Sequence, residues 1–216
     1  MKAPRRARAL AAASIALLFA ACADEAHKGD GVPMETTRTK EATLQTAIFA
    51  GGCFWCMEPP FDELEGVVET VVGYTGGKAE TATYEQVSAG GTRHVEAVRV
   101  RYDPRRTTYE QLLDIFWRSI DPTDGSGQFA DRGSQYQPGI YYLDEEQRRL
   151  AEESKKRLQS SGRFEQSIAV PILPARALYP AEGYHQDYYR KDPARYYRYR
   201  SGSGRAGFLD KTWGSD

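Results

Sequence analysis

A series of short strand-like runs, separated by turn residues, sets the outline of this 216-residue chain. The runs are apolar or rich in β-branched side chains, and Gly-Gly or Asp-Pro pairs follow the first three, as is typical of strand ends. They comprise residues 46–50, 67–75, 95–102, 139–143 and 167–173. The last run contains Pro171, which cannot donate to a strand ladder, so we expect that run near an edge or an end of a sheet.

Helical signals lie between these runs. A helix can begin at Cys53, and Pro59-Pro60 must either kink it or end a short first turn before a second helix. Thr107 and Glu110 have the spacing of a capping box. The apolar residues that follow recur at helical spacing and predict a helix packed on a core; they are Tyr109, Leu112, Leu113, Phe116, Trp117 and Ile120. Residues 144–161 predict a charged helix that Gly162 ends.

The resulting order, roughly β-α-β-β-α-β-α-β, mixes strands and helices without a strict β-α-β repeat. It favours the α+β class: a two-layer α/β plait of the ferredoxin-like kind, with helices packed on one side of a mixed sheet. The loop 121–136 is rich in Gly, Asp and Ser, and long ordered loops often carry function. From Tyr179 onward the chain is rich in tyrosine, and we expect this C-terminal segment to be mostly irregular.

The N-terminus has the pattern of a secretion signal. A basic stretch, residues 2–8, precedes the uncharged run 9–20, which is too short to cross a bilayer as a helix. Small residues before Cys22 make the pattern similar to a bacterial lipoprotein signal, in which the cysteine is lipidated and becomes the mature N-terminus. We therefore expect residues 1–21 to be a signal peptide and Cys22 to carry lipid. Cleavage near Ala21 that leaves an ordinary thiol is the alternative.

The chain beyond this signal is acidic and begins with a polar stretch. Without residues 1–21 it carries 25 basic against 30 acidic residues, so its bulk charge does not indicate a nucleic-acid partner. The mixture of basic and aromatic residues at 188–200 is better explained by packing around a site. Residues 22–43 have almost no large apolar side chains and predict a flexible tether, followed by a domain at 44–216.

If Cys22 carries lipid, the remaining cysteines are Cys53 and Cys56, spaced Cys-x-x-Cys. A disulfide between them closes too small a loop to stabilise a fold of this size, so a redox role is favoured over a structural one. Two buried thiols without chemistry are the structural alternative. A zinc site would need two more ligands, whereas His94 and His185 are isolated in the sequence.

Cys53 stands at a predicted helix start, where free N–H groups and the helix dipole favour a thiolate. We therefore expect a lowered pKa and a nucleophilic sulfur at Cys53. Cys56 lies three residues further along the helix and could form a disulfide with an oxidised Cys53. Phe54 and Trp55 place two large rings beside the nucleophile, which suits a methionine side chain, although core packing explains Phe54 equally well.

The segment 51–58, GGCFWCME, resembles the signature of the A-type peptide methionine sulfoxide reductases. Further segments similar to this family follow in order: 73–77 (GYTGG), 94–98 (HVEAV), 121–123 (DPT), 131–136 (DRGSQY) and 181–186 (AEGYHQ). The resemblance covers about residues 46–198. Together with the N-terminal signal pattern, it implies an exported, lipoprotein-type member of the family. It implies reduction of methionine S-sulfoxide, in proteins and as the free amino acid, to methionine.

The resemblance implies that Cys53 attacks the sulfoxide sulfur and becomes a sulfenic acid, while Glu96 supplies a proton. The period of the strand 95–102 supports the role of Glu96 independently, because this residue shares a face with Val98 and Val100. A carboxyl group in apolar surroundings has a raised pKa and can hold a proton to donate.

Other site residues follow from the resemblance alone. Tyr74 and Tyr136 match tyrosines that donate to the sulfoxide oxygen, and Asp131 matches a member of the site's hydrogen-bond network. His185 matches a histidine beside the site, where a structural role is nearly as plausible. Phe54 and Trp55 would hold the methyl group.

Recycling sets this chain apart from many family members, which use cysteines near the C-terminus; no cysteine follows Cys56 here. Cys56 would therefore form the disulfide with Cys53, and a thioredoxin-like protein would reduce it. No metal or bound organic cofactor is needed, because the thiols carry the redox change. We expect a monomer that repairs oxidised proteins in the bacterial cell envelope, facing the periplasm, with the outer membrane favoured because Ala23 follows Cys22.

Two other functions are compatible with parts of the sequence. A general envelope thiol–disulfide oxidoreductase would use the same Cys-x-x-Cys pair, but it would leave Glu96 and Trp55 unexplained. Activity on methyl sulfoxides without activity on protein disulfides would separate the two. An anchored peptide-binding protein would make the thiols incidental, and retained peptide affinity after Cys53→Ser would favour it.

Overall fold

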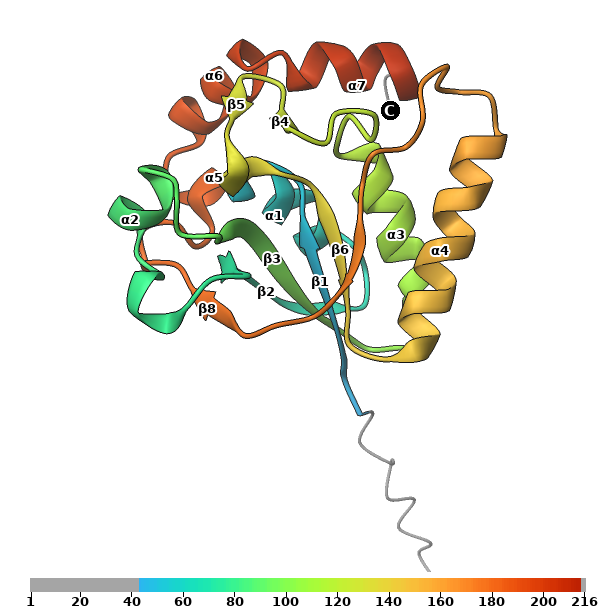
Figure 1. Ribbon diagram of the computed structural model, residues 1–216, viewed down its shortest axis with the longest axis horizontal. Coiled ribbons are helices and arrows are strands. Elements are labelled where there is room, and N and C mark those ends of the chain that lie inside the picture. Colours follow the sequence, from blue (N-terminus) through green and yellow to red (C-terminus); the bar gives the residue numbers. More distant parts are fainter. Residues whose placement is uncertain (1–42, 215–216) are drawn as a thin grey trace, which may run out of the picture. The chain divides into compact units, whose positions relative to one another are not determined.

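The computed structural model describes residues 43–214, so the predicted signal peptide, the lipidation site Cys22 and the predicted tether up to residue 42 lie outside the described residues. The described part contains a six-stranded sheet in the order β7-β6-β1-β3-β2-β8 (Figure 1). Its strands are β1 (Gln45–Ala50), β2 (Val67–Thr75), β3 (Val95–Tyr102), β6 (Gly139–Tyr142), β7 (Ile172–Pro174) and β8 (Leu178–Pro180). Neighbouring strands are antiparallel except β6 and β7, which are parallel, so the sheet is mixed.

Seven α-helices, two short 3-10 turns and a two-stranded ribbon complete residues 43–214. The helices are α1 (Phe54–Asp62), α2 (Tyr84–Ser88), α3 (Tyr109–Arg118), α4 (Glu145–Ser160), α5 (Tyr188–Lys191), α6 (Pro193–Gly202) and α7 (Arg205–Trp213). The ribbon pairs β4 (Gly127–Gln128) with β5 (Asp131–Arg132), and the 3-10 turns are η1 (Ala79–Thr81) and η2 (Ser134–Tyr136). Within this part of the chain, no helix combines the length and the apolar character that a bilayer crossing requires.

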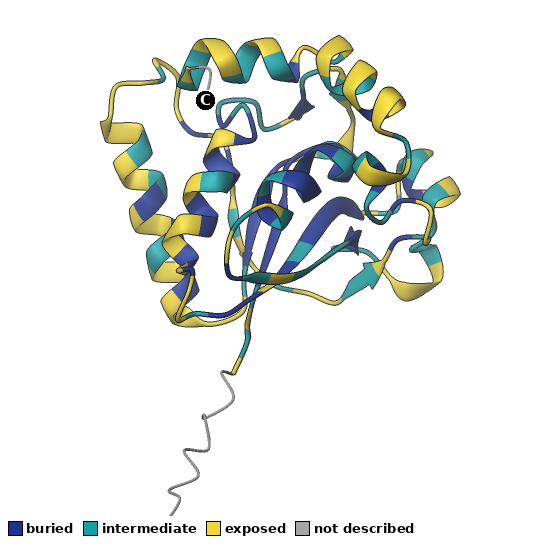
Figure 2. Cartoon of the chain, turned by 180° about the vertical axis from the view of Figure 1, so that it is seen from behind, coloured by how far each residue is buried: buried dark blue, intermediate teal, exposed yellow. Residues whose placement is uncertain are grey.

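The main core lies between the sheet and the helices α1 and α3. Phe49 of β1 stacks on Phe61 of α1, with ring centroids 5.1 Å apart, and on Phe116 of α3, at 5.2 Å. Val98 and Val100 of β3 are fully buried in the same cluster. Burial of this apolar surface is the main favourable contribution to folding. Figure 2 shows the sheet and α1 largely buried, whereas most of the surface of α4 is exposed.

The other face of the sheet is covered by the chain that joins β7 to β8. Ile48, Val95 and Tyr141 form a smaller buried cluster there, against Ala175 of that connection and Leu178 of β8. The predicted α+β fold, with helices on a mixed sheet, is thus confirmed. The sheet has one strand more than predicted, because β8 adds a short strand at the edge beside β2.

The first four predicted strands are found as β1, β2, β3 and β6, with bounds within one residue of the prediction. Helix α1 runs through Pro59 and Pro60 as one helix, so the alternative of two separate helices is excluded. Neither proline has an N–H, so the carbonyl groups of Trp55 and Cys56 cannot accept the usual i+4 hydrogen bond. The first turn of α1, which contains Cys56, therefore has two fewer backbone hydrogen bonds than a regular helix.

The start of α3 differs from the prediction by one residue. The capping box is formed by Thr108 and Gln111, not by Thr107 and Glu110. The Thr108 hydroxyl accepts from the Gln111 N–H at 3.3 Å, and the Gln111 side chain accepts from the Thr108 N–H at 2.8 Å. Thr107 is buried and donates to the Gln111 side chain instead, so it cannot serve as the cap.

The last predicted strand, 167–173, is mostly irregular, and β7 begins at Ile172. The N–H groups of Ile168 and Ala169 are bonded to the Gln159 side chain, at 2.7 Å, and to the Pro122 carbonyl, at 2.8 Å. Because these two N–H groups donate to acceptors outside the sheet, the segment before Ile172 does not pair with a neighbouring strand. The expectation of an edge position is confirmed, since β7 is the outermost strand beside β6.

The C-terminal segment contradicts the expectation of irregular chain. β8 and the helices α5, α6 and α7 occupy it, and Figure 1 shows α6 and α7 (red) beside the β4–β5 ribbon. A signal for α6 was present in the sequence: Asp192 accepts from the Arg195 N–H at 3.1 Å, and Pro193 follows it in the first turn. Most tyrosines of this segment lie in α5 and α6, whereas Tyr179 lies in β8 and Tyr184 in a turn.

Candidate active site

Two glycines place Cys53 between the end of β1 and the start of α1. Gly52 has a φ of +80°, which residues other than glycine rarely adopt. A Cβ at this position would lie 2.6 Å from the Cβ of Gln128. The chain therefore turns sharply, and Cys53 takes the N-cap position with its carbonyl accepting from the Cys56 N–H at 3.0 Å. The Cys53 side chain is 7% exposed, so the sulfur is almost removed from water.

Glu96 lies against the same turn from the neighbouring β3. It is 3% exposed, and its carboxyl group accepts from the Phe54 N–H at 2.9 Å. Burial raises the pKa of Glu96 to about 8, and the hydrogen bond from Phe54 opposes this only in part. The carboxyl group is therefore mostly protonated at neutral pH, as its place on the apolar face of β3 predicts.

The predicted thiolate at Cys53 is not found. Burial raises the pKa of Cys53 above its ordinary value, and the hydrogen bond to Cys56 and the nearby Glu96 act in the same direction. The helix start does not compensate, because the first N–H of α1, that of Phe54, is bonded to Glu96. The prediction of a lowered pKa at Cys53 is therefore wrong, and the residue is a neutral thiol.

Cys53 opens on a small pocket of about 110 Å³ built from α1, α2, β3, β5, η2 and α6. Its walls are mainly aromatic and include two carboxyl groups. The lining residues are Cys53, Phe54, Trp55, Tyr84, Glu96, Asp131, Tyr136 and Tyr199. Six of them were predicted from the sequence, and the structure brings all six together. A space of this volume holds about three or four groups the size of a water molecule, which suits a methyl sulfoxide group.

Tyr84 and Tyr199 are pocket residues that the sequence analysis missed. Tyr84 is held at the first turn of α2, where its N–H donates to Glu182 at 2.8 Å. The Tyr199 hydroxyl of α6 donates to both oxygens of Asp131, at 2.5 and 2.6 Å. The chain has 14 tyrosines, and no local pattern distinguishes these two, because they reach the pocket through tertiary contacts alone.

Tyr74 is not part of the pocket lining. Its ring is fully buried 5.9 Å from the ring of Phe54, and its hydroxyl donates to Glu182 at 2.9 Å. The predicted contact with a sulfoxide oxygen is therefore not supported by the position of Tyr74. Tyr84, which is held by the same Glu182, lines the pocket instead.

His185 lies behind the aromatic wall rather than in it. Its Nδ1 accepts from the Trp55 indole N–H at 3.0 Å, and its ring lies 5.0 Å from that of Phe54. Burial lowers the pKa of His185, so the ring is neutral and can act as this acceptor. His185 therefore holds Trp55 in place and does not line the pocket.

Comparisons with known proteins agree with this geometry. Residues 45–216 match the family model described as peptide methionine sulfoxide reductase. The chain belongs to this family. It is 54% identical to the peptide methionine sulfoxide reductase MsrA of Bacillus subtilis over 171 residues, which cover 79% of this chain and 97% of that protein. MsrA 2 of Staphylococcus aureus is 49% identical over 173 residues, 80% of this chain and 98% of the relative.

Solved structures of the family have the same fold. Methionine sulfoxide reductase A of Corynebacterium diphtheriae is 34% identical, with a TM-score of 0.61 over 69% of this chain and 76% of that one. Mxr1 of Saccharomyces cerevisiae in reduced form is 29% identical, with a TM-score of 0.66 over 72% and 92%. The chain is thus an enzyme of the MsrA family, an oxidoreductase that acts on methionine sulfoxide.

The second cysteine of the reductase faces away from the pocket. Cys56 is 2% exposed and lines a separate cavity of about 430 Å³. Both cysteines are free thiols in contact with each other, and the hydrogen bond from Cys53 lowers the pKa of Cys56. Burial opposes this shift, whereas Arg205 and Arg200 add to it. The cysteine with the lowered pKa is thus Cys56, whereas the sequence predicted a lowered pKa at Cys53.

The histidines of the reductase that the structure describes have structural partners. His94 donates from Nε2 to the Lys78 carbonyl at 2.9 Å, and its Nδ1 accepts from the Gly77 N–H at 3.3 Å. Across residues 43–214, no three His, Cys, Asp or Glu side chains are grouped as a metal site requires.

Proposed function

We propose that this reductase uses Cys53 to reduce the S-epimer of methionine sulfoxide, in proteins and as the free amino acid. The observation that supports this is the buried, protonated carboxyl group of Glu96 in the same small pocket as the Cys53 thiol. Breaking the S–O bond of a sulfoxide requires a proton on the oxygen. Thiol–disulfide exchange breaks no S–O bond, so it has no oxygen that must be protonated.

The first step conserves atoms and electrons. Glu96 donates its proton to the sulfoxide oxygen while the Cys53 sulfur bonds to the sulfoxide sulfur and gives its own proton to the carboxylate. The hydroxyl group then moves from the substrate sulfur to the Cys53 sulfur, the bond between the two sulfurs breaks, and the sulfide leaves as methionine. Cys53 is then a sulfenic acid, oxidised by two electrons, and the substrate sulfur is reduced by two.

The pocket tyrosines orient the sulfoxide oxygen. Burial raises the pKa of both Tyr84 and Tyr136, so their hydroxyl groups stay protonated and can donate. The rings of Phe54 and Trp55 then take the methyl group. Trp55 is fixed for this role by stacking on Tyr188, with ring centroids 3.8 Å apart, and by its bond to His185.

Cys56 completes the catalytic cycle. Its thiolate attacks the Cys53 sulfur, the S–O bond breaks, and the oxygen leaves as water once it has received a proton. The sulfenic acid is thereby replaced by a Cys53–Cys56 disulfide, which a thioredoxin-like dithiol protein reduces. The contact between the two thiols in the reduced site supports this pairing.

Single-turnover experiments with a methionine sulfoxide peptide of defined epimer test this function. Cys53→Ser should form no methionine, whereas Cys56→Ser should form one methionine per enzyme and then stop with thioredoxin as reductant. Loss of the S-epimer with retention of the R-epimer in the product analysis is expected. Full thioredoxin-dependent cycling by Cys56→Ser would contradict the proposed disulfide.

We further propose that the enzyme is a lipoprotein of the bacterial envelope, with residues 1–21 as the signal and Cys22 as the lipid attachment site. The basic stretch, the short uncharged run and the cysteine that follows small residues support this. Growth with a labelled fatty acid should label the full chain and leave Cys22→Ser unlabelled. Cys56→Ser is the matched control and should keep the label; labelling of Cys22→Ser would exclude lipid at this position.

A further inference from the structure

The cavity at Cys56 is separate from the substrate pocket. It has a volume of about 430 Å³ and is built mainly from the helices α1, α3, α5, α6 and α7. No residue lines both this cavity and the pocket of about 110 Å³ that contains Cys53. Cavities of a few hundred cubic ångströms are typical of sites for small molecules. The reduction of methionine sulfoxide at Cys53 leaves this space without a use.

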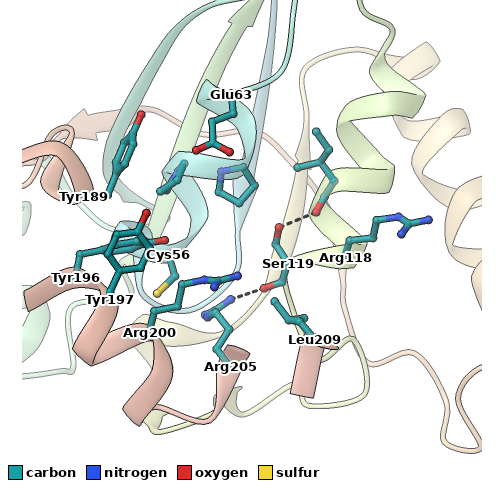
Figure 3. Close-up of a pocket in the computed structure, with 13 residues that line it drawn as sticks. Cys56, Glu63, Arg118, Ser119, Tyr189, Tyr196, Tyr197, Arg200, Arg205 and Leu209 are labelled. Atoms are coloured by element: carbon teal, nitrogen blue, oxygen red, sulfur yellow. Dashed lines mark hydrogen bonds between the residues drawn. The ribbon is translucent and has the colours of Figure 1, made fainter. Parts of the chain in front are cut away.

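One end of the cavity is cationic. Figure 3 shows the side chains of Arg200 and Arg205 ending beside the Cys56 sulfur. Glu63, the acidic residue of the wall, lies away from them in the same view. The charges of the two arginines add to the hydrogen bond from Cys53 in lowering the pKa of Cys56, against the effect of burial. The arginines therefore favour a negative charge at this end.

Neither of these arginines has an anionic partner. In the described part of the chain, residues 43–214, no carboxylate forms an ion pair with Arg200 or Arg205. Arg118, the third cation of the wall, differs because it is paired with Asp114 at 2.8 Å. The charge of Arg118 is thus compensated, whereas the other two charges act on the cavity.

Arg205 is the unusual member of the pair, because it is 1% exposed. Its guanidinium donates to the backbone carbonyls of Gly51, at 2.9 Å, and Ser119, and it lies 4.7 Å from the ring of Phe129. These neutral partners satisfy its hydrogen bonds but not its charge. A buried cation of this kind is costly unless an anion comes near it.

The rest of the wall suits an apolar group. It consists of aliphatic, proline and tyrosine side chains: Pro59, Pro60, Ile115, Leu209, Tyr189, Tyr196 and Tyr197. Tyr197 is 60% exposed, so this wall reaches the surface of the molecule and a ligand can enter there. A ligand that matches both ends has an anionic head and an apolar body. The planar guanidinium group binds a carboxylate head through two parallel hydrogen bonds.

We propose that this cavity is a regulatory site for a small organic carboxylate, whose head lies between Arg200 and Arg205 and whose body lies on Ile115 and Leu209. The bound carboxylate and a Cys56 thiolate compete for the same two cations. An occupied cavity therefore disfavours the thiolate. This regulation rests on the proposed function, in which the Cys56 thiolate forms the disulfide with an oxidised Cys53.

The competition acts in both directions. The ligand raises the pKa of Cys56, and ionisation of Cys56 weakens the ligand by the same factor. Binding should therefore slow formation of the disulfide from the sulfenic acid. It should leave the formation of methionine unchanged, because that step occurs at Cys53 in the other pocket.

Calorimetric titration of the reduced full chain with benzoate tests the site. Benzamide, which has nearly the same shape but no charge, is the matched control ligand. Benzoate should bind at one site per chain with a Kd of about 1 mM or lower. Benzamide should bind at least about tenfold more weakly. Equal binding of both ligands, or no saturable binding of benzoate, would overturn the proposal. Sulfate that binds as tightly as benzoate would overturn the organic class of the ligand.

A matched pair of substitutions places the ligand. Arg200→Gln removes a charge from the cavity wall, and Arg198→Gln removes one from an exposed position of α6 that lines neither space. Arg200→Gln should weaken benzoate by about tenfold, the value of one charged hydrogen bond. Arg198→Gln should stay within about twofold. Equal weakening by both variants, or none by either, would refute the site.

The pH dependence of binding tests the competition without a change at either arginine. The affinity for benzoate should fall as the pH rises through the pKa of Cys56, whereas Cys56→Ser should bind benzoate without this fall. The other titratable or charged groups that act on Cys56 are Cys53, Glu96, Asp131, Tyr196, Arg200 and Arg205. Cys56→Ser retains all of them, so a fall that persists in this variant would contradict the competition.

Single turnover links binding to regulation. Saturating benzoate should slow disulfide formation by about fivefold or more and leave the amount and rate of methionine formed unchanged. No slowing, or equal slowing of both steps, would refute the regulation. Failure of the proposed function has a different signature, because it removes the methionine or the disulfide without benzoate and leaves calorimetric binding intact.

Discussion

The surroundings of Cys53 and Cys56 differ although the residues are three positions apart. Around Cys53, burial in a small aromatic pocket raises the pKa of the thiol, and the buried Glu96 beside it has a raised pKa and holds a proton. Around Cys56, a larger cavity contains Arg200 and Arg205, and the thiolate is favoured. The difference teaches that one Cys-x-x-Cys motif can present two unlike sulfurs: one suited to accept oxygen from a neutral substrate, the other to exchange disulfides with an anion.

The largest effect is expected for a substitution that impairs only the reaction at Cys53. Glu96→Gln keeps the shape of the carboxyl group but removes its proton, so methionine formation in a single turnover should slow by about 10²- to 10⁴-fold. Reduction of the pre-formed disulfide by dithiothreitol should change little, because it occurs on the Cys56 side. Rapid-quench assays measure the first rate and thiol titration the second. An equal loss in both rates would contradict the division of the site.

The pH dependence sharpens the same comparison. Because the pKa of Glu96 is raised to about 8, the rate of methionine formation should fall as the pH rises through about 8. The folded state should also lose stability between pH 4.5, the ordinary value, and about 8, since the buried carboxyl group resists ionisation. Urea denaturation and single-turnover assays across this range measure both effects. Glu96→Gln should show neither; a fall that persists in this variant would assign the titration to another group.

The Cys56 side is tested by Arg205. Arg205→Met leaves the carbonyl groups of Gly51 and Ser119 without their donor, so unfolding by urea should show a loss of about 2–4 kcal/mol. It should also slow formation of the disulfide from the sulfenic acid, because Cys56 loses a nearby cation. Arg205→Lys keeps the charge and should recover that rate more fully than it recovers stability. Equal recovery of both would mean that Arg205 has a purely structural role.

The smallest effect distinguishes two tyrosines that share Glu182. Tyr84→Phe removes a donor from the pocket and should lower kcat/KM for a sulfoxide peptide by about tenfold, the value of one lost hydrogen bond. Tyr74→Phe removes a hydroxyl that donates to Glu182 and does not line the pocket, and it should change kcat/KM by less than about threefold. Steady-state kinetics of both variants provide the test. The opposite ranking would restore the predicted role of Tyr74.

The sequence predicted those parts of the fold and site in which local pattern decides. The alternation in 95–102 placed Glu96 with Val98 on a buried face, and burial then follows from the period of a strand. The position of Gly51-Gly52 directly before Cys53 predicted a turn into α1, and the positive φ of Gly52 confirms it. The apolar spacing of α3 predicted the helix that packs on Phe49.

Tertiary structure decided what depends on residues far apart in the chain. Tyr84 and Tyr199 enter the pocket through Glu182 and Asp131, contacts that no spacing reveals. The pKa of Cys53 was mispredicted because the helix start was considered alone, whereas burial and Glu96 outweigh it. Periodicity and turn residues act within a few positions and can be read from the sequence. Desolvation and charge sum over every neighbour in space, so the fold alone determines that the pKa of Cys53 is raised and that of Cys56 is lowered.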